Sequence, residues 1–504
     1  MSTDPSPELL AAFRLFVEQA NWDVLRPLDK QRFHDFISRA DRDGWEASGD
    51  EVYTMLLAAG AAYEESRRLS LMYGHGREAL RQAGEGAREA ALEQTLAPEW
   101  SSLGVPAAAP APAPRRTKLR AAIIGCGAFS MGQNVPNCLR SELIDVTWVY
   151  DYLPEKAAAA AARFSPAPRV ADSLEQLLAD PELDLCICAV PHSEHERVVL
   201  AVAAAGKHIF TEKPMAMTMD EVYAIQKAIK QSGVKLCVDY NRGSSPAMRD
   251  FKAVYQAHRA NPRIAPGQLV VADRPSLPEE EASTLLIRVQ DESSTYGPVH
   301  LDWHTGGGEI IGETCHWLEL TCWLFEESPV RIFATGSARM THMITMDFAS
   351  GRQAVIIFSV TGTFRYPKEL YEITDHGALL RSLCFVENEY YGLAGVPSQR
   401  LFTLEADPRL RVTAPGHAGY VAACNARADQ YAAHPEQGYL PITIDKGHFN
   451  LLNSFAEAIL EDGPSPVDEK AGARATYLAL RAIESLRTGH PVPINKEDMD
   501  MFVA

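Results

Sequence analysis

The sequence lacks three features that would each point to a different class of protein: a Cys-x-x-Cys pair, a long apolar run and a cluster of basic residues. Its nine cysteines lie mostly within apolar stretches such as Leu185-Cys-Ile-Cys-Ala189, which predicts reduced, mostly buried thiols rather than a disulfide framework. No run approaches the ~20 apolar residues of a membrane helix, and Met1–Glu8 lacks the basic and apolar segments of a signal peptide. We therefore expect a soluble, cytoplasmic protein.

The charge balance is acidic, with a formal net charge of −18. Binding to nucleic acid needs clustered Lys and Arg, which the sequence does not contain, so nucleic acid is not an expected partner. Hydrophobic residues make up 46% of the 504 residues, and a chain of this length is too long for one ordinary core. We predict two or three domains.

Four segments follow one another along the chain. Residues 1–103 are predicted to form a helical N-terminal domain, and the Pro/Ala tract in residues 104–117 is predicted to be an extended linker. Residues 118–240 are predicted to form a doubly wound α/β domain. Residues 241–504 are predicted to form an α+β domain with an open, mostly antiparallel sheet and C-terminal helices that pack back on it.

The first segment is predicted to be helical because its apolar residues recur at helical spacing, as Leu9, Phe13 and Phe16 do. Breaks are expected near Gly74 and Gly84. Oligomer assembly, a pocket lid and docking to a partner protein are all open as roles for this domain.

From residue 118 to 240, short apolar runs alternate with amphipathic or Ala-rich stretches, which is typical of a doubly wound parallel sheet. The expected strands are Ala121–Gly125, Val146–Asp151, Leu185–Val190, His208–Thr211 and Lys235–Asp239. The expected helices are Pro154–Arg163, Ser173–Leu178, Glu194–Ala205 and Met219–Ser232.

Beyond residue 241 the pattern changes to longer β-rich runs. The expected strands are Thr284–Val289, Arg331–Thr335, His342–Phe348, Ala354–Thr361, Leu370–Thr374 and Ala378–Val386. Asp375-His-Gly377 predicts a hairpin turn between the last two. The tail is expected to be helical over Phe449–Leu460 and Lys470–Leu486.

The stretch Ala121-Ala-Ile-Ile-Gly-Cys-Gly-Ala-Phe-Ser130 predicts a strand, a tight turn and a helix. Gly125, Gly127 and Ser130 occupy the three small-residue positions of a dinucleotide-binding turn. Asp151 ends the next apolar run, about where an acidic side chain accepts hydrogen bonds from an adenosine ribose. Its charge would repel the 2′-phosphate of NADP, so the pattern favours NAD, with NADP less favoured.

Further motifs follow in order: Val190-Pro-His-Ser-Glu-His195, Phe210-Thr-Glu-Lys-Pro214, Asp239-Tyr-Asn-Arg242 and Gly306-Gly-Gly-Glu-Ile-Ile-Gly-Glu-Thr-Cys-His316. With the glycine turn, their order and spacing closely resemble the Gfo/Idh/MocA family of NAD(P)-dependent oxidoreductases over roughly residues 118 to 492. The resemblance implies a Rossmann domain, a second domain whose open sheet carries the substrate pocket, and a homo-oligomer, either a dimer or a tetramer.

By this resemblance Lys213 is the active-site lysine that hydrogen-bonds the reacting oxygen, and Glu212 contacts the cofactor ribose. His316 is the base that takes the substrate hydroxyl proton while a hydride leaves carbon for the nicotinamide. The family often has an aspartate four residues before this histidine, where this chain has Gly312. Glu313 is the candidate replacement, since it lies three residues before His316 and shares its helical face.

The remaining expectations concern the cofactor and the substrate. The residues expected at the dinucleotide are Gly125, Cys126, Gly127, Ala128, Phe129, Ser130, Asp151, Val190, Pro191, His192, His195, Glu212, Lys213 and Asn241. The residues expected at the substrate are Arg242, Arg288, Trp303 and His304.

His300-Leu-Asp-Trp-His304 carries three side chains of metal-ligand type within five residues. In an extended segment, alternation places His300, Asp302 and His304 on one side. These are metal-ligand types, but they would form a row without a fourth ligand, so lining of a polar substrate pocket is favoured over a metal site.

Three functions remain open at this point. The first is an NAD-dependent oxidoreductase that interconverts a secondary alcohol and a ketone on a small polyhydroxylated substrate: a sugar, a sugar derivative or a cyclitol. The second is a redox-neutral glycosidase or epimerase that uses NAD for transient oxidation. The third is a non-catalytic binding protein that senses a dinucleotide.

Overall fold

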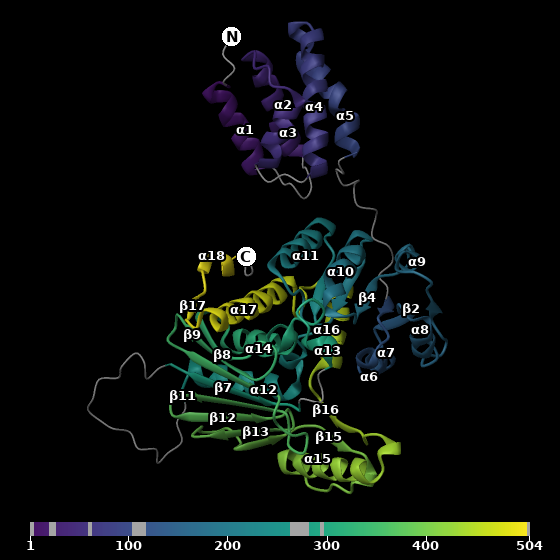
Figure 1. The fold of residues 1–504 in the computed structure, drawn as a ribbon, viewed down its shortest axis with the longest axis vertical. Coiled ribbons are helices and arrows are strands. Elements are labelled where there is room, and N and C mark those ends of the chain that lie inside the picture. Colours follow the sequence, from purple (N-terminus) through teal and green to yellow (C-terminus); the bar gives the residue numbers. More distant parts are fainter. Residues whose placement is uncertain are drawn as a thin grey trace, which may run out of the picture. The chain divides into compact units, whose positions relative to one another are not determined.

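The computed structural model describes residues 5–19, 27–58, 63–102, 117–262, 282–292 and 297–500. The chain divides into two compact units, Met1–Arg115 and Arg116–Ala504 (Figure 1). Apart from Thr117, the predicted linker lies outside the described residues.

The first unit is helical throughout its described residues. Its helices are α1 (Pro7–Gln19), α2 (Pro27–Arg42), α3 (Gly49–Ala58), α4 (Tyr63–Gln82) and α5 (Arg88–Ser102). Aromatic rings form much of the core, as the Phe13–Phe36 and Phe16–Phe33 ring pairs show, with centroids 5.2 and 5.1 Å apart. The predicted break near Gly84 is confirmed, whereas the break near Gly74 is wrong. Helix α4 continues through Gly74 because buried Met72 and Tyr73 keep its apolar face in the core.

The second unit begins with the doubly wound domain. Its parallel sheet has the strand order β3-β2-β1-β4-β5-β6 within the described residues. The strands are β1 (Leu119–Ile124), β2 (Ile144–Tyr150), β3 (Arg169–Val170), β4 (Leu185–Cys188), β5 (His208–Thr211) and β6 (Leu236–Val238). All five predicted strands are confirmed, and the short β3 was not predicted because its two residues are both exposed.

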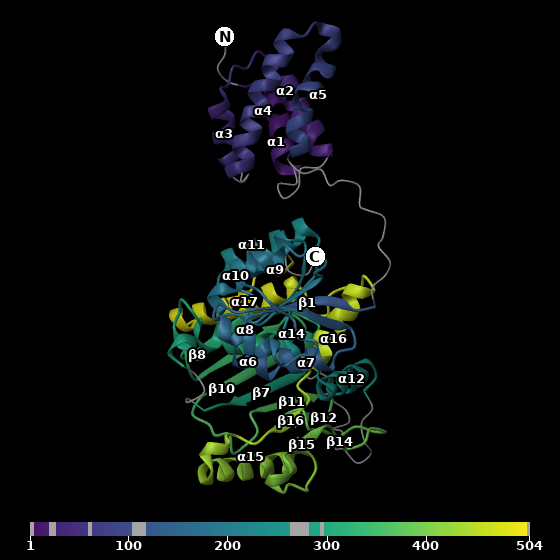
Figure 2. The same ribbon diagram turned by 90° about the vertical axis from the view of Figure 1, so that its right-hand side faces the viewer.

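Helices cover both faces of this sheet, because the strands are apolar on both sides. Ala121 and Ile123 of β1 belong to one core and Ala122 and Ile124 to the other. The helices of this domain are α6 (Ala128–Gly132), α7 (Asn134–Arg140), α8 (Pro154–Ala161), α9 (Leu174–Leu178), α10 (His195–Ala204) and α11 (Met219–Ser232), whereas α12 (Pro246–Ala260) packs on the sheet of the second domain. Figure 2 shows α10 and α11 on one side of β1 and α7 on the other.

The second domain contains a large sheet with the order β14-β13-β12-β11-β7-β10-β9-β8-β17 in the described part of the chain. The pair β7 (Thr284–Gln290) and β10 (Gln353–Ser359) is parallel. The other pairs are antiparallel, and their strands are β8 (Pro329–Gly336), β9 (His342–Phe348), β11 (Glu369–Asp375), β12 (Ala378–Leu383), β13 (Glu387–Tyr391), β14 (Gln399–Leu401) and β17 (Val492–Pro493). The predicted fold class is therefore confirmed.

The hairpin between β11 and β12 is also confirmed. Asp375 pairs with Ala378, so the loop is His376-Gly377. Both loop residues have positive φ, 42° and 76°, as a two-residue turn of this hand requires.

The remaining elements lie beside the two sheets, and α16 (His448–Leu460) packs against the parallel sheet, where its Phe455 ring lies 6.2 Å from that of Phe210 on β5. They are α13 (Pro298–Leu301), α14 (Cys315–Phe325), α15 (Gly416–Ala433), α16 (His448–Leu460), α17 (Glu469–Thr488), α18 (Lys496–Asp500) and the strand pair β15 (Leu404–Ala406) and β16 (Ile442–Ile444). Helix α17 joins the two domains of this unit, since Thr476 donates to Ala216 O and Ser485 Oγ accepts from Ala334 N of β8. The C-terminal helices thus pack back on both sheets, as predicted.

All nine cysteine thiols are buried and unpaired. In the described part of the chain, no helix has the length and apolarity needed to cross a membrane.

Candidate active site

The glycine turn follows β1 directly. Gly125 has a φ of +86°, and a Cβ on it would lie 2.2 Å from Ala189 O, so this position accepts only glycine. A Cβ on Gly127 would meet nothing within 4 Å, which leaves open space against the backbone. This is the shape that the close approach of a pyrophosphate requires.

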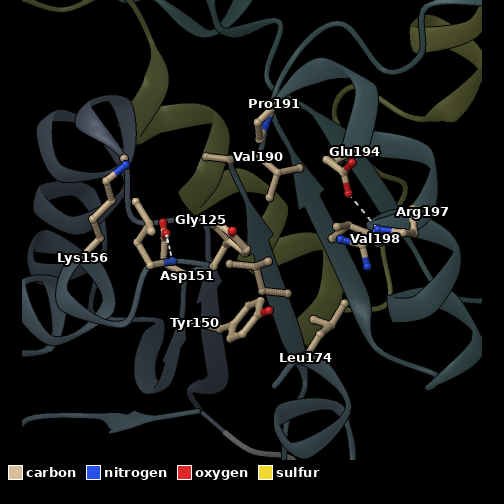
Figure 3. Close-up of a pocket in the computed structure, with 15 residues that line it drawn as sticks. Gly125, Tyr150, Asp151, Lys156, Leu174, Val190, Pro191, Glu194, Arg197 and Val198 are labelled. Atoms are coloured by element: carbon tan, nitrogen blue, oxygen red, sulfur yellow. Dashed lines mark hydrogen bonds and ion pairs between the residues drawn. The ribbon is translucent and has the colours of Figure 1, made fainter. Parts of the chain in front are cut away.

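A cavity of about 540 Å³ opens beside this turn (Figure 3). Asp151 lies in its wall, with one carboxylate oxygen accepting from Cys126 N (2.6 Å) and the other from Leu153 N (2.8 Å). Figure 3 shows Lys156 on one side and Arg197 on the other, where Arg197 Nε donates to Glu194 at 2.7 Å. The two backbone bonds fix the Asp151 carboxylate and leave further lone pairs for ligand hydroxyls.

A second cavity of about 380 Å³ shares Ala189 and Val190 with the first, so the two are adjacent. It is lined by Phe129, Ala189, Val190, His192, Glu212, Lys213, Arg242, His300, Glu313, His316, Lys446 and His448. The structure therefore brings together Lys213, Glu313 and His316, the three residues predicted to be catalytic.

Lys213 is held by two acceptors. Its Nζ donates to Gly312 O at 2.6 Å and to Glu313 Oε1 at 2.7 Å. Burial alone would lower the pKa of Lys213, but the negative charge of Glu313 outweighs burial and raises that pKa above its ordinary value. Lys213 is thus a charged donor near neutral pH.

Glu313 lies between two lysines. Its Oε2 is 3.5 Å from Lys368 Nζ, and Lys368 in turn contacts Asp291 at 2.5 Å. Burial would raise the pKa of Glu313, but the charges of Lys213 and Lys368 lower it well below its ordinary value. Lys213, Glu313, Lys368 and Asp291 form a row of alternating charges that runs from the cavity to the end of β7.

The absence of a side chain at Gly312 has a steric explanation. A Cβ there would lie 3.1 Å from His300 Nε2 and 3.2 Å from His192 Cε1. Two imidazole rings thus occupy the space into which a larger side chain would project. Glu313, one position later in the π-helical turn Ile310–Thr314, reaches Lys213 instead.

His316 is in the first turn of α14 and is 5% exposed. Burial lowers its pKa well below its ordinary value, and the positive charges of Arg242 and Lys213 lower it further. Its ring meets the Tyr240 ring edge-on at 5.6 Å, and among the described residues Nδ1 has no hydrogen-bond partner. His316 is therefore neutral near pH 7 and able to accept a proton.

Arg242 and Lys446 form a charged wall with Glu369. The Arg242 guanidinium donates to both oxygens of Glu369 at 2.9 and 3.1 Å, and Lys446 Nζ donates at 3.1 Å. Glu369 is buried, and these cations hold its pKa far below its ordinary value. The three groups leave one surplus positive charge beside the cavity.

Glu212 and Asp239 end the neighbouring strands β5 and β6. Burial, and then the charge of Asp239, raises the pKa of Glu212 well above its ordinary value. Glu212 Oε1 and Asp239 Oδ1 are buried and have no hydrogen-bond partner among the described residues. Buried oxygens of this kind fit the hydroxyls of a bound ligand, so the residues present suit a dinucleotide.

Two further histidines support the loop between the cavities. His192 Nδ1 lies 2.8 Å from Gly306 O, and His195 lies 2.6 Å from Pro214 O and 3.0 Å from Val190 O. Burial lowers the pKa of both rings. They connect the loop after β4 to the lysine loop and to the glycine run before α14.

Eight of the predicted site residues are not among the residues that line the two cavities: Cys126, Ala128, Ser130, His195, Asn241, Arg288, Trp303 and His304. The first three belong to the glycine turn and its helix, and Asn241 Nδ2 donates to Lys446 O at 2.8 Å. Arg288 lies over the Tyr366 ring, at 5.5 Å from its centroid.

The extended segment predicted over His300–His304 is wrong. Pro298–Leu301 is helical, and Asp302 closes the following turn by accepting from His304 N at 2.9 Å and Thr305 N at 3.1 Å. Trp303 is 41% exposed under the Arg339 guanidinium. Only His300 of this segment lines the cavity, and no group of metal-ligand side chains occurs in the described structure.

His300 lines the cavity as predicted, whereas sequence reasoning missed Lys446, His448 and the row partner Lys368. Each is a single residue without a local pattern, and each reaches the site through contacts between distant parts of the chain.

Comparisons with known proteins agree with this fold. Residues 119–240 match the GFO_IDH_MocA family model, described as an oxidoreductase family with an NAD-binding Rossmann fold. The uncharacterized oxidoreductase YrbE of Bacillus subtilis is 24% identical over 345 residues, which cover 66% of this chain and 84% of YrbE. Inositol 2-dehydrogenase of Rhizobium meliloti is 25% identical over 354 residues, which cover 67% and 89%.

Among solved structures, the WlbA dehydrogenase of Bordetella pertussis, in complex with NADH and UDP-GlcNAcA, has a TM-score of 0.55 at 19% identity. The match covers 75% of this chain and 98% of that one, and it shows a common fold. The fold and the matches define the class of protein, an NAD(P)-dependent oxidoreductase. The resemblance to the Gfo/Idh/MocA family that the sequence motifs predicted is confirmed, with the family model matched over residues 119–240.

Proposed function

We propose that this protein is an NAD-dependent oxidoreductase that interconverts a secondary alcohol and a ketone on a sugar, a sugar derivative or a cyclitol. The observation that carries the proposal is the convergence of charged Lys213 and neutral His316 in one cavity that adjoins the glycine turn. The names of relatives point the same way. They include inositol 2-dehydrogenase and the 1,5-anhydro-D-fructose reductase of Ensifer adhaerens.

The dinucleotide is held by residues of the first cavity and supplies the hydride acceptor when it is bound. Gly127 leaves its backbone open to the pyrophosphate, and Asp151 accepts from a ribose hydroxyl with its remaining lone pairs. The fixed charge of Asp151 disfavours a 2′-phosphate, so we assign NAD rather than NADP.

The chain's own residues then perform the acid–base work. The Lys213 ammonium donates a hydrogen bond to the reacting oxygen and stabilises negative charge on it in the alkoxide-like transition state. Glu313 keeps Lys213 charged and fixes its Nζ at the cavity wall. His316 takes the hydroxyl proton, and in the reverse direction returns it to the carbonyl oxygen.

The wall suits a polyhydroxylated substrate. Arg242 and Lys446 offer hydrogen-bond donors on one side, and His192 and His300 present imidazole nitrogens on another. Such polar groups select a substrate by its hydroxyls. A substrate that lacks one of these hydroxyls leaves a buried polar group of the protein without a hydrogen-bond partner, so it binds less well.

The test has two parts. The purified protein is denatured and any released dinucleotide is identified, and titration calorimetry compares the binding of NAD and NADP. A panel of sugars and cyclitols is then scanned for NADH formation. Binding of NAD with NADH formation from a polyol is the expected result. Tighter binding of NADP contradicts the role of Asp151, and conversion of substrate without NADH points to the redox-neutral alternative.

A further inference from the structure

The segment before α16 is attached firmly to the turn that follows β6. Asn241 Nδ2 donates to Lys446 O and Ser245 Oγ to Asp445 O, both at 2.8 Å, and Asn450 Nδ2 donates to Ser244 O at 3.2 Å. Gly447 has a φ of +93°, and a Cβ on it would lie 2.3 Å from Asn241 O. Only a glycine allows this close approach, which fixes the position of the next residue, His448.

His448 forms a pair with Asp239. Its Nδ1 lies 3.0 Å from Asp239 Oδ2, and the two side chains are 20% and 2% exposed. Because a carboxylate accepts hydrogen bonds, Nδ1 carries the hydrogen and Nε2 is left as a free acceptor nitrogen. The ring lines the same cavity as His316 and meets Phe129 edge-on at 5.8 Å.

His448 and His316 differ in the charged groups that face them. Asp239 faces His448 directly, and burial raises the pKa of Glu212, the next carboxyl group. His316 is buried next to Arg242 and Lys213, and its pKa is lowered by burial first and then by those charges, with His448 contributing to the same effect. Lys446 lines the same cavity as the two histidines, and its ammonium group donates a hydrogen bond to Glu369.

The reaction as proposed does not say which group removes the proton from His316 after each turnover. A proton taken by His316 from a substrate hydroxyl is held unfavourably, because the imidazolium lies among like charges in a buried site. The proton must move on before the next turnover. His448 is partly exposed and has a carboxylate partner, so it combines a route to water with stabilisation of the charged ring.

We propose that His448, oriented by Asp239, is a second proton-transfer residue of this site, which passes the substrate proton between His316 and solvent. The inference rests on the proposed function. His316 accepts the hydroxyl proton, then gives it to Nε2 of neutral His448, which becomes an imidazolium paired with Asp239. That imidazolium releases the proton to water at the cavity mouth, and both rings are neutral again. Reduction of the ketone runs the same steps in reverse.

The test compares His448→Asn and Asp239→Asn with the wild-type enzyme. A matched control is His434→Asn, because His434 pairs with Glu436 at 3.4 Å on the surface, outside the cavity. We expect kcat for polyol oxidation to fall at least about tenfold in His448→Asn, a typical effect for loss of a proton-transfer group. The solvent deuterium isotope effect on kcat should rise, and added imidazole should restore much of the rate. The control should match wild type.

Several outcomes overturn the inference. A His448→Asn enzyme with the kcat of the wild type would show that turnover does not require proton transfer through His448. A slow variant that imidazole does not rescue, or that has lost thermal stability or dinucleotide binding, assigns His448 a structural role.

A readout independent of turnover is the nitrogen NMR signal of the His448 ring. Nδ1 should be protonated in wild type, and this preference should be lost in Asp239→Asn. If Nε2 carries the hydrogen in wild type, the hydrogen bond from His448 Nδ1 to Asp239 is wrong. Absence of turnover by the wild-type chain on every polyol contradicts the proposed function instead, and the ring signal still decides the geometry.

Discussion

Lys213 Nζ and Glu313 Oε1 lie 2.7 Å apart, although 100 residues separate them in the sequence. Lys213 follows β5 of the parallel sheet, and Glu313 lies in the turn that precedes α14 of the second domain. The pair therefore joins the domain of the parallel sheet to the domain of the second sheet. Lys213 and Glu313 line the same cavity as His316, so an ammonium group and an imidazole lie in one cavity.

Loss of the ammonium should stop the chemistry without unfolding the protein. We expect Lys213→Met to lower kcat for polyol oxidation by on the order of 10²–10³-fold, because the reacting oxygen loses its charged donor. The measurement is steady-state NADH formation. Lys235→Met is the matched control, since Lys235 forms an ion pair with Asp462 at 2.8 Å outside both cavities. Equal losses in both variants would remove the catalytic role of Lys213.

Lys368 should act on Lys213 through Glu313. Replacement by Met removes one of the two cations that lower the pKa of Glu313, so that pKa should rise and the Lys213–Glu313 pair should weaken on the acid side. We expect kcat to fall about tenfold at neutral pH, with the loss growing as pH falls. Lys368→Arg should recover part of it.

The control for this variant is Lys252→Met. Lys252 pairs with Glu326 at 3.0 Å and lies over a tryptophan ring, as Lys368 does, but away from the cavity. If the pH dependence of Lys368→Met parallels wild type, the row of charges does not tune the site.

The pH profile reports on His316. Oxidation needs its neutral form, and its pKa is lowered well below the ordinary value of 6.5. Activity should therefore persist as pH falls through 6.5, and the acid limb of kcat/KM should lie well below that value. An acid limb near 6.5 that disappears in His316→Asn would show that the ring titrates as an exposed histidine does.

Asp151 should decide between the two dinucleotides. Asp151→Asn keeps the side-chain oxygen that can accept from Cys126 N or Leu153 N but removes the negative charge. We expect the preference for NAD over NADP, measured as a ratio of kcat/KM values, to fall by about tenfold or more. The exposed Asp145 on β2 is a suitable control site. An unchanged ratio would place the discrimination elsewhere in the cavity.

The fold was largely predictable because its signals are local. Continuous apolar runs, the glycine turn and the hairpin at Asp375 each follow from a few adjacent residues, and all are confirmed. The prediction failed at Trp303 and His304, where alternation suggested an extended segment. Pro298 instead begins a helical turn, and the Asp302 side chain closes the turn that follows.

The site was predictable only where a motif marks it. Lys213 and His316 stand at fixed places in recognisable stretches, and both line the cavity. His448 could not be found this way. It enters the cavity because the chain around residue 445 binds the turn near residue 245, a contact across 200 residues that no local pattern encodes.

The central claim is that a carbinol hydrogen of a polyol leaves as hydride in this cavity. Its most direct test uses a polyol that carries deuterium at the carbinol carbon, incubated with the protein and NAD, with the reduced dinucleotide analysed by mass spectrometry. The account predicts deuterium in NADH, formed in equal amount to ketone, and none with Lys213→Met. Turnover that leaves the label on the polyol and forms no labelled NADH would contradict it.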